Sequence, residues 1–386
     1  MTIQDIYVLG AARTPMGGLM GALSGVSAAD LGGAAIAAAL ARAGGPAVDA
    51  LFMGCVLPAG QGQAPARQAG FAGGLGQEVP ATTLNKMCGS GMQAVMMASD
   101  AIRAGSAGIV VAGGMESMSN APYLLPKMRA GARLGHAQAL DHMFLDGLED
   151  AYDKGRLMGT FAEDCAAEFA FSRQAQDDYA LASLTRAQDA IAGGAFATEI
   201  APVTVPGRGK VTVIDTDEQP GLARPDKIPL LKPAFRDGGT VTAANSSSIS
   251  DGAAALVLGG RAEGAVARIV GHASHAQAPG QFPTAPVPAA EKLLARIGWD
   301  SDSVDLWEVN EAFAVVPMAF MARMGLSHDR VNVHGGACAL GHPIGASGAR
   351  IIVTLIHALQ ARGLRRGVAA ICIGGGEGTA LAVELC

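Results

Sequence analysis

The stretch that decides the fold is residues 88–114, CGSGMQAVMMASDAIRAGSAGIVVAGG. It opens with a Gly-Ser turn and continues with Met92, Val95, Met96 and Ile102, which fall on one face of a helix. It closes with an apolar run and two glycines. The pattern predicts a helix followed by a buried strand, and a strand packed against a helix is the repeating unit of α/β layers.

A comparable stretch follows near the C-terminus, residues 345–376, GASGARIIVTLIHALQARGLRRGVAAICIGGG. It has a Gly-Ser turn, a helix through Ile352, Leu355 and Leu359, and an apolar strand at 368–372 that ends in three glycines. Two such units in one chain indicate a duplicated fold. The first half also predicts a strand at 6–9, a helix at about 28–42 and a strand at 51–54.

The pattern changes between the two halves, from about residue 119 to residue 245. Charged helical segments at 163–169 and 174–192 alternate here with connections rich in proline and glycine. We therefore expect an inserted lobe. Because small-molecule sites favour domain interfaces, this lobe is a candidate wall of a ligand cleft.

Composition limits the class of protein. Half of the 386 residues are hydrophobic and 16% are charged, so the chain can bury a large core over two or more domains. The net charge of −6 comes without a basic block, and we expect no nucleic-acid partner. Residues 1–5 lack the start of a signal peptide, and no apolar run suggests a membrane span, so we expect a cytoplasmic protein. The six cysteines are scattered, which argues against a disulfide framework.

Cys88 is a candidate nucleophile. It lies in Asn85-Lys86-Met87-Cys88-Gly89-Ser90-Gly91, where an extended segment should turn into a helix. The N-terminus of a helix presents free N–H groups and partial positive charge, so we expect a lowered thiol pKa and a thiol exposed by a glycine turn. The alternative is an inert cysteine that fills a tight turn.

His342 is a candidate base. Its surroundings, residues 335–345, are too rich in glycine and proline to predict a helix. A histidine in such a loop can accept a thiol proton near neutral pH, and the alternative is a solvent-facing turn residue. His334, Cys338 and His342 recur every four residues, but the flanking glycines and Pro343 interrupt the helix that would align them on a metal, so we expect no metal site.

Two further residues end predicted strands. Cys372 precedes three glycines, whose backbone N–H groups suit an oxyanion hole. Asn310 could hold a water or a carbonyl, and its alternative is an ordinary helix N-cap followed by Glu311.

Taken together, these segments resemble the thiolase family. The resemblance rests on blocks in family order along essentially the whole chain: Ala12 to Pro15, Asn85 to Gly91, Gly113 to Ser119, Asn310 to Phe313, Gly341 to Gly348 and Cys372 to Gly376. It implies an α/β thiolase fold, with two similar layered αβαβα domains from a duplication and an inserted loop domain. The implied boundaries are 1–118, completed by about 246–262, for the N-terminal domain, 119–245 for the loop domain, and 263–386 for the C-terminal domain.

The resemblance also implies roles. Cys88 would be acylated, His342 would activate it, and Cys372 would shuttle protons to the leaving group and from the attacking acetyl carbon. Asn310 would hold a water in one oxyanion hole together with His342. The backbone N–H groups of Cys88 and Gly374 would form the other.

Coenzyme A thioesters would be the substrates, with no cofactor. Similar enzymes hold the pantetheine arm with a serine, here Ser247, and with a His-Met pair, here Leu157-Met158. Because leucine replaces the histidine, the preferred chain length stays open. Arg224 or Lys227 could reach the nucleotide phosphates. The other implied contacts are Leu148, Phe235, Ala243, Ala312 and Phe313.

The first hypothesis is an acetyl-CoA acetyltransferase that converts two acetyl-CoA to acetoacetyl-CoA and CoA. The second is a 3-ketoacyl-CoA thiolase for longer or branched chains, and the third is a catalytically silent acyl-CoA-binding relative. A ketosynthase would not need Cys372. Residues 122–146 resemble the loop through which related enzymes form tetramers, so we expect a homodimer or homotetramer. The alternative is that the apolar residues of this segment, Met128, Leu134, Leu140, Met143 and Phe144, pack in the core of their own subunit.

Overall fold

The computed structural model describes residues 4–207, 209 and 211–386, so residues 1–3 of the N-terminal segment lie outside it. Its core is a mixed sheet in the order β12-β13-β14-β11-β1-β10-β5-β3-β4, with β2 paired to β10. The strands are β1 (Ile6–Arg13), β2 (Gly17–Gly18), β3 (Ala50–Gly54), β4 (Ala81–Leu84), β5 (Ile109–Ser117), β10 (Ser250–Gly259), β11 (Ala267–Ala276), β12 (Leu306–Val309), β13 (Arg366–Ile373) and β14 (Glu377–Leu385). The antiparallel pairing of β1 with β11, from Ile6 to Val8, joins the strands of the two halves.

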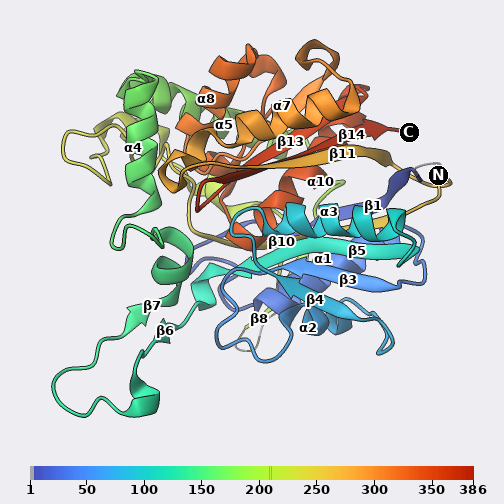
Figure 1. Cartoon of the computed structure of the whole chain (residues 1–386), viewed down its shortest axis with the longest axis horizontal. Helices are drawn as coiled ribbons and strands as arrows, with labels where there is room; N and C mark the ends of the chain where they lie inside the picture. Colours follow the sequence, from blue (N-terminus) through green and yellow to red (C-terminus); the bar gives the residue numbers. More distant parts are fainter. Residues whose placement is uncertain (1–3, 208, 210) are drawn as a thin grey trace.

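Helices separate and cover the strands in layers. Helices α1 and α2 pack on the outer face of the first half, α3 and α10 lie between the halves, and α7 and α8 cover the second half (Figure 1). Their bounds are α1 (Ala28–Arg42), α2 (Pro65–Ala72), α3 (Ser90–Arg103), α7 (Pro286–Ile297), α8 (Val315–Met324) and α10 (Ile344–Arg362). The predicted α/β class is confirmed, and the layer order α, β, α, β, α runs through both halves together.

The two central helices, α3 and α10, meet through equivalent glycines. A Cβ built on Gly91 of α3 would lie 2.8 Å from the backbone nitrogen of Ala349, and one on Gly348 of α10 would lie 2.5 Å from that of Met92. Each glycine of the repeated Gly-Ser turns therefore lets the partner helix approach closely. The reciprocity of these contacts supports the duplication that the sequence predicts.

Helix α10 is long and apolar enough to cross a membrane, which the sequence analysis did not anticipate. In the structure, 83% of its apolar window is buried. An all-round apolar helix enclosed by sheets is the core helix of a layered fold. The loop that carries His342 leads directly into the N-terminus of α10.

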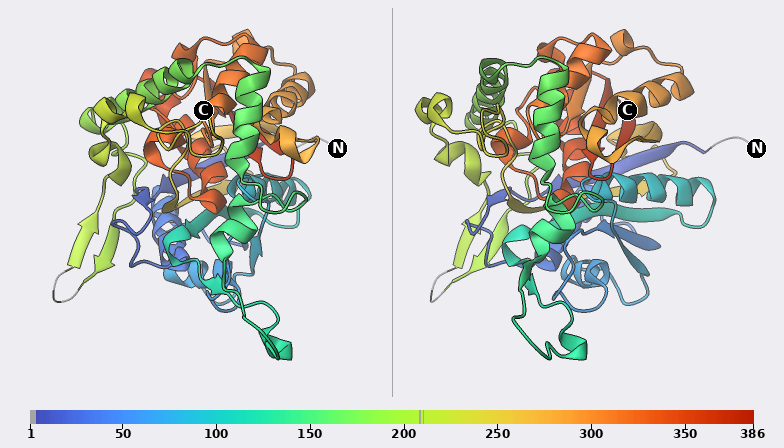
Figure 2. Two further views of the ribbon diagram at one scale, coloured as in Figure 1. Left: turned by 90° about the vertical axis from the view of Figure 1, so that its left-hand side faces the viewer. Right: turned by 60° about the vertical axis from the view of Figure 1, so that its left-hand side comes forward.

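The segment between the halves wraps one side of the molecule. Its elements are η1 (Met118–Asn120), β6 (Tyr123–Leu124), η2 (Met128–Ala130), β7 (Leu140–Asp141), η3 (Phe144–Leu148), α4 (Met158–Glu168), α5 (Arg173–Ala192), β8 (Val203–Pro206), β9 (Val211–Ile214), α6 (Glu218–Leu222) and η4 (Pro225–Leu230). The β6–β7 arm and the β8–β9 hairpin project from the body in different directions (Figure 2). The exact domain boundaries stay a prediction.

The core-packing alternative for residues 122–146 holds for Met143, which is buried in a core cluster, and fails for the tip of the β6–β7 arm. Leu134 is 97% exposed and Met128 is 46% exposed, so these side chains do not pack in the core of their own subunit. The later loop, which was expected to lack helix, contains one short helical turn, α9 (Ala337–Leu340). The remaining short elements are η5 (Pro279–Thr284), η6 (Ser301–Ser303) and η7 (His328–Arg330).

Candidate active site

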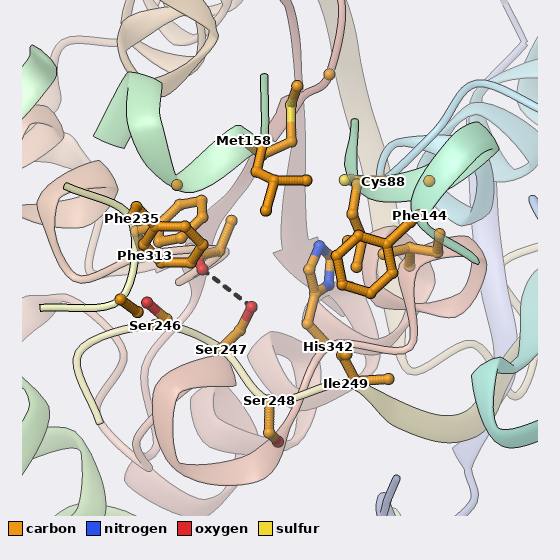
Figure 3. Close-up of a pocket in the computed structure, with 18 of the residues that line it drawn as sticks. Cys88, Phe144, Met158, Phe235, Ser246, Ser247, Ser248, Ile249, Phe313 and His342 are labelled. Atoms are coloured by element: carbon orange, nitrogen blue, oxygen red, sulfur yellow. Dashed lines mark hydrogen bonds between the residues drawn. The ribbon is translucent and has the colours of Figure 1, made fainter. Parts of the chain in front are cut away.

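A cavity of about 380 Å³ lies where the inserted segment meets the two halves. Cys88, His342 and Gly374 line it, and they come from three different loops (Figure 3). The predicted coenzyme A contacts that line the same cavity are Leu148, Leu157, Met158, Phe235, Ala243, Ser247, Ala312 and Phe313. A mostly apolar cavity of this size with a few converging polar groups is typical of a small-molecule site.

Cys88 lies in a tight turn between β4 and α3. Met87 adopts a φ of +46°, a left-handed conformation that is unfavourable for a residue with a side chain. The hydroxyl of Ser90 donates to the carbonyl of Met87 at 2.6 Å and supports this conformation. Gly89 admits the end of β13, because a Cβ there would lie 2.4 Å from Cδ1 of Ile373. The residue that bends the chain is therefore Met87 rather than a glycine.

The Cys88 thiol is not acidic in the free protein. Burial raises its pKa to about 11, although the backbone N–H groups of Gly374 and of Cys88 itself point at the sulfur and lower it. The expected lowering of the pKa by the helix is therefore wrong, since α3 begins only at Ser90 and burial dominates. At neutral pH the thiol is protonated, so it needs a base.

His342 can serve as that base. Its side chain is buried, so the solvent-facing alternative is wrong. Its Nδ1 lies 2.5 Å from Oγ of Ser347, whose single hydroxyl proton goes to the carbonyl of Pro343 at 3.0 Å. Nδ1–H therefore donates to Ser347, and Nε2 keeps its lone pair. Nε2 has no hydrogen-bond partner among the described residues.

The imidazole is uncharged at neutral pH. Burial, together with the smaller effect of the positive charge of Arg350, lowers the pKa of His342 to about 3. Arg350 itself forms a buried ion pair with Glu308 at 2.9 Å. His334, which shares the four-residue spacing, instead lies with its ring edge against Phe196.

Cys372 and Asn310 lie behind the cavity wall at the ends of β13 and β12. Burial raises the pKa of Cys372 well above its usual range, and the charge of a Cys88 thiolate acts in the same direction. Both side-chain atoms of Asn310 are buried without a partner in the described part of the chain. The next helix begins at Val315, so the N-cap reading of Asn310 is wrong. A free buried amide is suited to hold a water or a carbonyl oxygen.

Ser247 connects the cavity wall to the loop that follows Asn310. Its hydroxyl and its N–H both donate to the carbonyl of Ala312, at 2.9 Å and 3.0 Å (Figure 3). Beside it, Phe313 packs edge-to-face on Phe235 with ring centroids 5.9 Å apart. Four of the residues predicted to hold a pantetheine arm, Ser247, Ala312, Phe313 and Phe235, are thus in contact with one another or adjacent in the chain.

Arg224 and Lys227 lie elsewhere. They line an adjacent cavity of about 310 Å³ that shares Ala243, Ser246 and Ser248 with the first. The Arg224 side chain is 67% exposed and pairs with Asp226 at 3.7 Å. The structure therefore does not bring Arg224 to the cavity of Cys88.

Glu116 is a site residue to which the sequence assigned no role. This fully buried carboxylate accepts the backbone N–H groups of Val56, Leu57 and Gly345 at 2.9, 3.1 and 2.9 Å. Burial raises its pKa to about 7, which these three hydrogen bonds oppose. Glu116 joins the loop after β3 to the start of α10 directly behind Cys88. The sequence feature that could have drawn attention to Glu116 is the presence of an acidic residue at the end of an otherwise apolar strand.

Comparison with known proteins covers the whole chain. The thiolase N-terminal domain family matches residues 6–262, and the thiolase C-terminal domain family matches residues 264–385. Acetyl-CoA acetyltransferase 2 of Arabidopsis thaliana is 49% identical, over 99% of this chain and 97% of that protein. A probable acetyl-CoA acetyltransferase of Escherichia coli is 46% identical over 99% of each chain.

Solved structures agree in fold. The acetyl-CoA acetyltransferase of Bacillus anthracis superposes with a TM-score of 0.96 at 38% identity, covering 100% of this chain and 99% of the other. The Acat5 thiolase of Ascaris suum in complex with coenzyme A gives a TM-score of 0.93 at 42% identity, with coverage of 99% and 100%. With both domain families matched and relatives this similar along their full length, the chain belongs to the thiolase family.

Proposed function

We propose that this thiolase is an acetyl-CoA C-acetyltransferase, which joins two acetyl-CoA into acetoacetyl-CoA and CoA and also runs in reverse. One observation carries the proposal. The Cys88 sulfur faces two backbone N–H donors, those of Cys88 and Gly374, in the same apolar cavity as His342, whose Nε2 is free. These are the parts that acyl transfer to a cysteine requires: a nucleophile, a base and an oxyanion hole.

In the first half-reaction, Nε2 of His342 takes the thiol proton while the sulfur of Cys88 attacks the acetyl carbonyl. The N–H groups of Cys88 and Gly374 stabilise the oxyanion, and losing one such donor typically costs about 3 kcal/mol. CoA leaves with a proton that Cys372 delivers. Because the free thiol and imidazole are both neutral, the charged nucleophile forms only when substrate fills the cavity.

In the second half-reaction, Cys372 removes a proton from the methyl group of a second acetyl-CoA. A water held by Asn310, together with His342, stabilises the enolate oxygen. The enolate carbon attacks the acetyl group on Cys88, a carbon–carbon bond forms, and the thiolate leaves. The amide of Asn310, which has no partner among the described residues, and the electrostatic influence of Cys88 on Cys372 support this assignment.

The pantetheine arm would lie along the wall formed by Ser247, Phe235 and Phe313, and Met158 and Leu157 line the same cavity. The names of the relatives favour acetyl groups. Leu157 occupies the position at which similar enzymes have a histidine. This difference favours a second candidate function, that of a 3-ketoacyl-CoA thiolase for longer chains. Arg224 would reach the nucleotide only across the adjacent cavity.

We further propose a cytoplasmic enzyme that uses no metal or cofactor and assembles as a homodimer or homotetramer. The exposed leucine and methionine of the β6–β7 arm support a tetramer contact, because exposed apolar residues gathered on a projecting arm are typical of protein interfaces. Size-exclusion chromatography with light scattering tests the assembly.

The activity itself is tested by incubating the purified protein with acetyl-CoA. We expect acetoacetyl-CoA and free CoA in a 1:1 ratio, and cleavage of acetoacetyl-CoA when CoA is supplied. Cleavage of only longer 3-ketoacyl-CoA would favour the second candidate. Binding without turnover of any acyl-CoA would identify a silent relative.

Replacing Ser347 by alanine should slow catalysis without weakening binding. The change removes the acceptor that holds Nδ1–H of His342 and thereby keeps Nε2 as the base. We expect kcat to fall roughly 10- to 100-fold, part of the ~10²–10⁴ that a general base contributes, with KM nearly unchanged. Ser99→Ala removes another buried helical serine hydroxyl, one without a partner among the described residues, and should leave kcat intact. Equal effects of both changes would argue against a positioning role for Ser347.

Replacing Cys372 by serine should separate the half-reactions. A serine hydroxyl is a much weaker acid than a thiol, so it cannot supply the base that removes the methyl proton. Mass spectrometry should still find an acetyl group on Cys88 after incubation with acetyl-CoA, whereas acetoacetyl-CoA formation should fall by about 10²-fold or more. Full condensation activity in this variant would exclude Cys372 as the second base.

A further inference from the structure

The two walls of the cavity belong to different parts of the hydrophobic core. Phe313 and Phe282, with Phe235 and Met158 packed against them, belong to the core cluster of the C-terminal half. The opposite wall belongs to a smaller cluster, which contains Ile344 and, packed against it, Leu148, Ile249 and Cys88 itself. Figure 3 shows Phe235 and Phe313 on one side of His342 and Phe144 and Ile249 toward the other.

Phe144, which is 38% exposed, also lines the cavity and projects from a firmly held turn. It opens η3, a single π-helical turn in which its carbonyl accepts the N–H of Glu149 at 2.8 Å. Asp146 pairs with Nδ1 of the buried His142 at 2.7 Å and ties the turn to the chain before it. Gly147 rests on Ile344, since a Cβ there would lie 3.2 Å from its Cδ1. A π-turn of this kind is frequent at functional sites.

If the proposed function is correct, the geometry of a thioester determines which wall of the cavity the acyl chain meets. The attacked carbonyl carbon carries the sulfur of the pantetheine arm on one side and the acyl chain on the other. If the arm lies along Ser247 and Phe313, the acyl chain must leave the carbonyl toward the opposite wall. There it meets Phe144, whose ring lines the cavity beside Cys88.

We infer that Phe144, which lines the same cavity as Ile249 and Ile344, is the specificity-determining residue that limits the acyl chain. The phenyl ring occupies the volume that the third and later carbons of a longer chain would need. In a hydrophobic pocket, one methylene typically changes kcat/KM by roughly 10- to 200-fold. A ring of this size therefore suffices to restrict the enzyme to acetyl groups.

The test compares Phe144→Ala and Phe144→Leu with Phe235→Ala on the opposite wall. The measured quantity is kcat/KM for CoA-dependent cleavage of acetoacetyl-CoA, 3-ketohexanoyl-CoA and 3-ketooctanoyl-CoA. Phe144→Ala should raise the ratio of 3-ketohexanoyl-CoA to acetoacetyl-CoA cleavage by about 10-fold or more, and Phe144→Leu should raise it less. Phe235→Ala should lower kcat/KM for all three substrates and leave the ratio unchanged.

An unchanged ratio in both Phe144 variants, or a shift produced by Phe235→Ala instead, would overturn the inference. The leucine variant keeps an apolar side chain on η3, so it supplies the comparison if the alanine variant does not fold. Acetylation of Cys88 in the unmodified protein is measured in the same samples by mass spectrometry. An acetylated Cys88 with an unchanged ratio rejects only the role of Phe144, whereas no acetylation rejects the proposed function as well.

Discussion

Cys88→Ala should abolish condensation and cleavage while leaving the fold and the assembly intact. In the proposed mechanism the sulfur of Cys88 receives the acetyl group, and alanine offers no replacement. Removal of the nucleophile in enzymes that form acyl intermediates commonly costs about 10⁴-fold or more in kcat. Steady-state rates with acetyl-CoA and with acetoacetyl-CoA plus CoA measure the loss. The chain keeps its turn, because Met87, Gly89 and Ser90 define it through backbone contacts.

The matched control is Cys386→Ala, which removes an exposed thiol at the end of the chain. It should retain full activity. Incubation with labelled acetyl-CoA followed by peptide mapping should place the label on the peptide of Cys88 in the control and on no peptide in Cys88→Ala. Residual condensation above a few percent in Cys88→Ala would reject this cysteine as the nucleophile.

The helices and strands of the fold were predictable where a local hydrophobic pattern encodes them. The strand at 6–9, the helix at 28–42 and the two Gly-Ser units appear in the structure as β1, α1 and the α3–β5 and α10–β13 pairs. These elements follow from local periodicity, which the chain carries in adjacent residues. The pairing of β1 with β11, by contrast, joins residues more than 250 positions apart, and no local pattern encodes it.

The position of the turn that carries Cys88 was predictable from the sequence, but the electrostatics of its thiol were not. The turn that carries Cys88 was correctly placed before a helix, whereas its thiol pKa was predicted in the wrong direction. A helix N-terminus is visible in the sequence, but the burial that raises the pKa of the thiol arises only when distant segments pack. For the same reason the sequence could not reveal that Glu116 holds three backbone N–H groups from two separate loops.

Arg13→Ala should produce the largest loss of stability. Arg13 lies fully buried at the end of β1, where its guanidinium pairs with both oxygens of Asp217 at 2.7 and 2.9 Å and with Glu199 at 2.5 Å. Burial alone would lower its pKa, but the two carboxylates raise it above the usual value. Alanine would leave two buried carboxylates without their cation, which typically costs about 3–5 kcal/mol.

Urea unfolding, followed by circular dichroism, measures this cost against Arg268→Ala. Arg268 also contacts two carboxylates, those of Asp5 and Glu384, but its side chain is 34% exposed. Its loss should cost only about 1 kcal/mol or less, because water solvates the groups left behind. Equal losses in the two variants would show that burial does not set the strength of the Arg13 network.

The position of the network connects this stability to the active site. Glu199 and Asp217 lie in the inserted segment, which also supplies Met158 and Leu157 to the cavity, so Arg13 ties that segment to the first half. Arg13→Ala should therefore loosen the cavity wall before the central sheet unfolds, and protease should cut the inserted segment first. Adding Glu199→Gln and Asp217→Asn to Arg13→Ala removes the uncompensated charges and should recover part of the lost stability. If the triple variant is no more stable than Arg13→Ala, the loss comes from the missing side-chain volume rather than from unpaired charge.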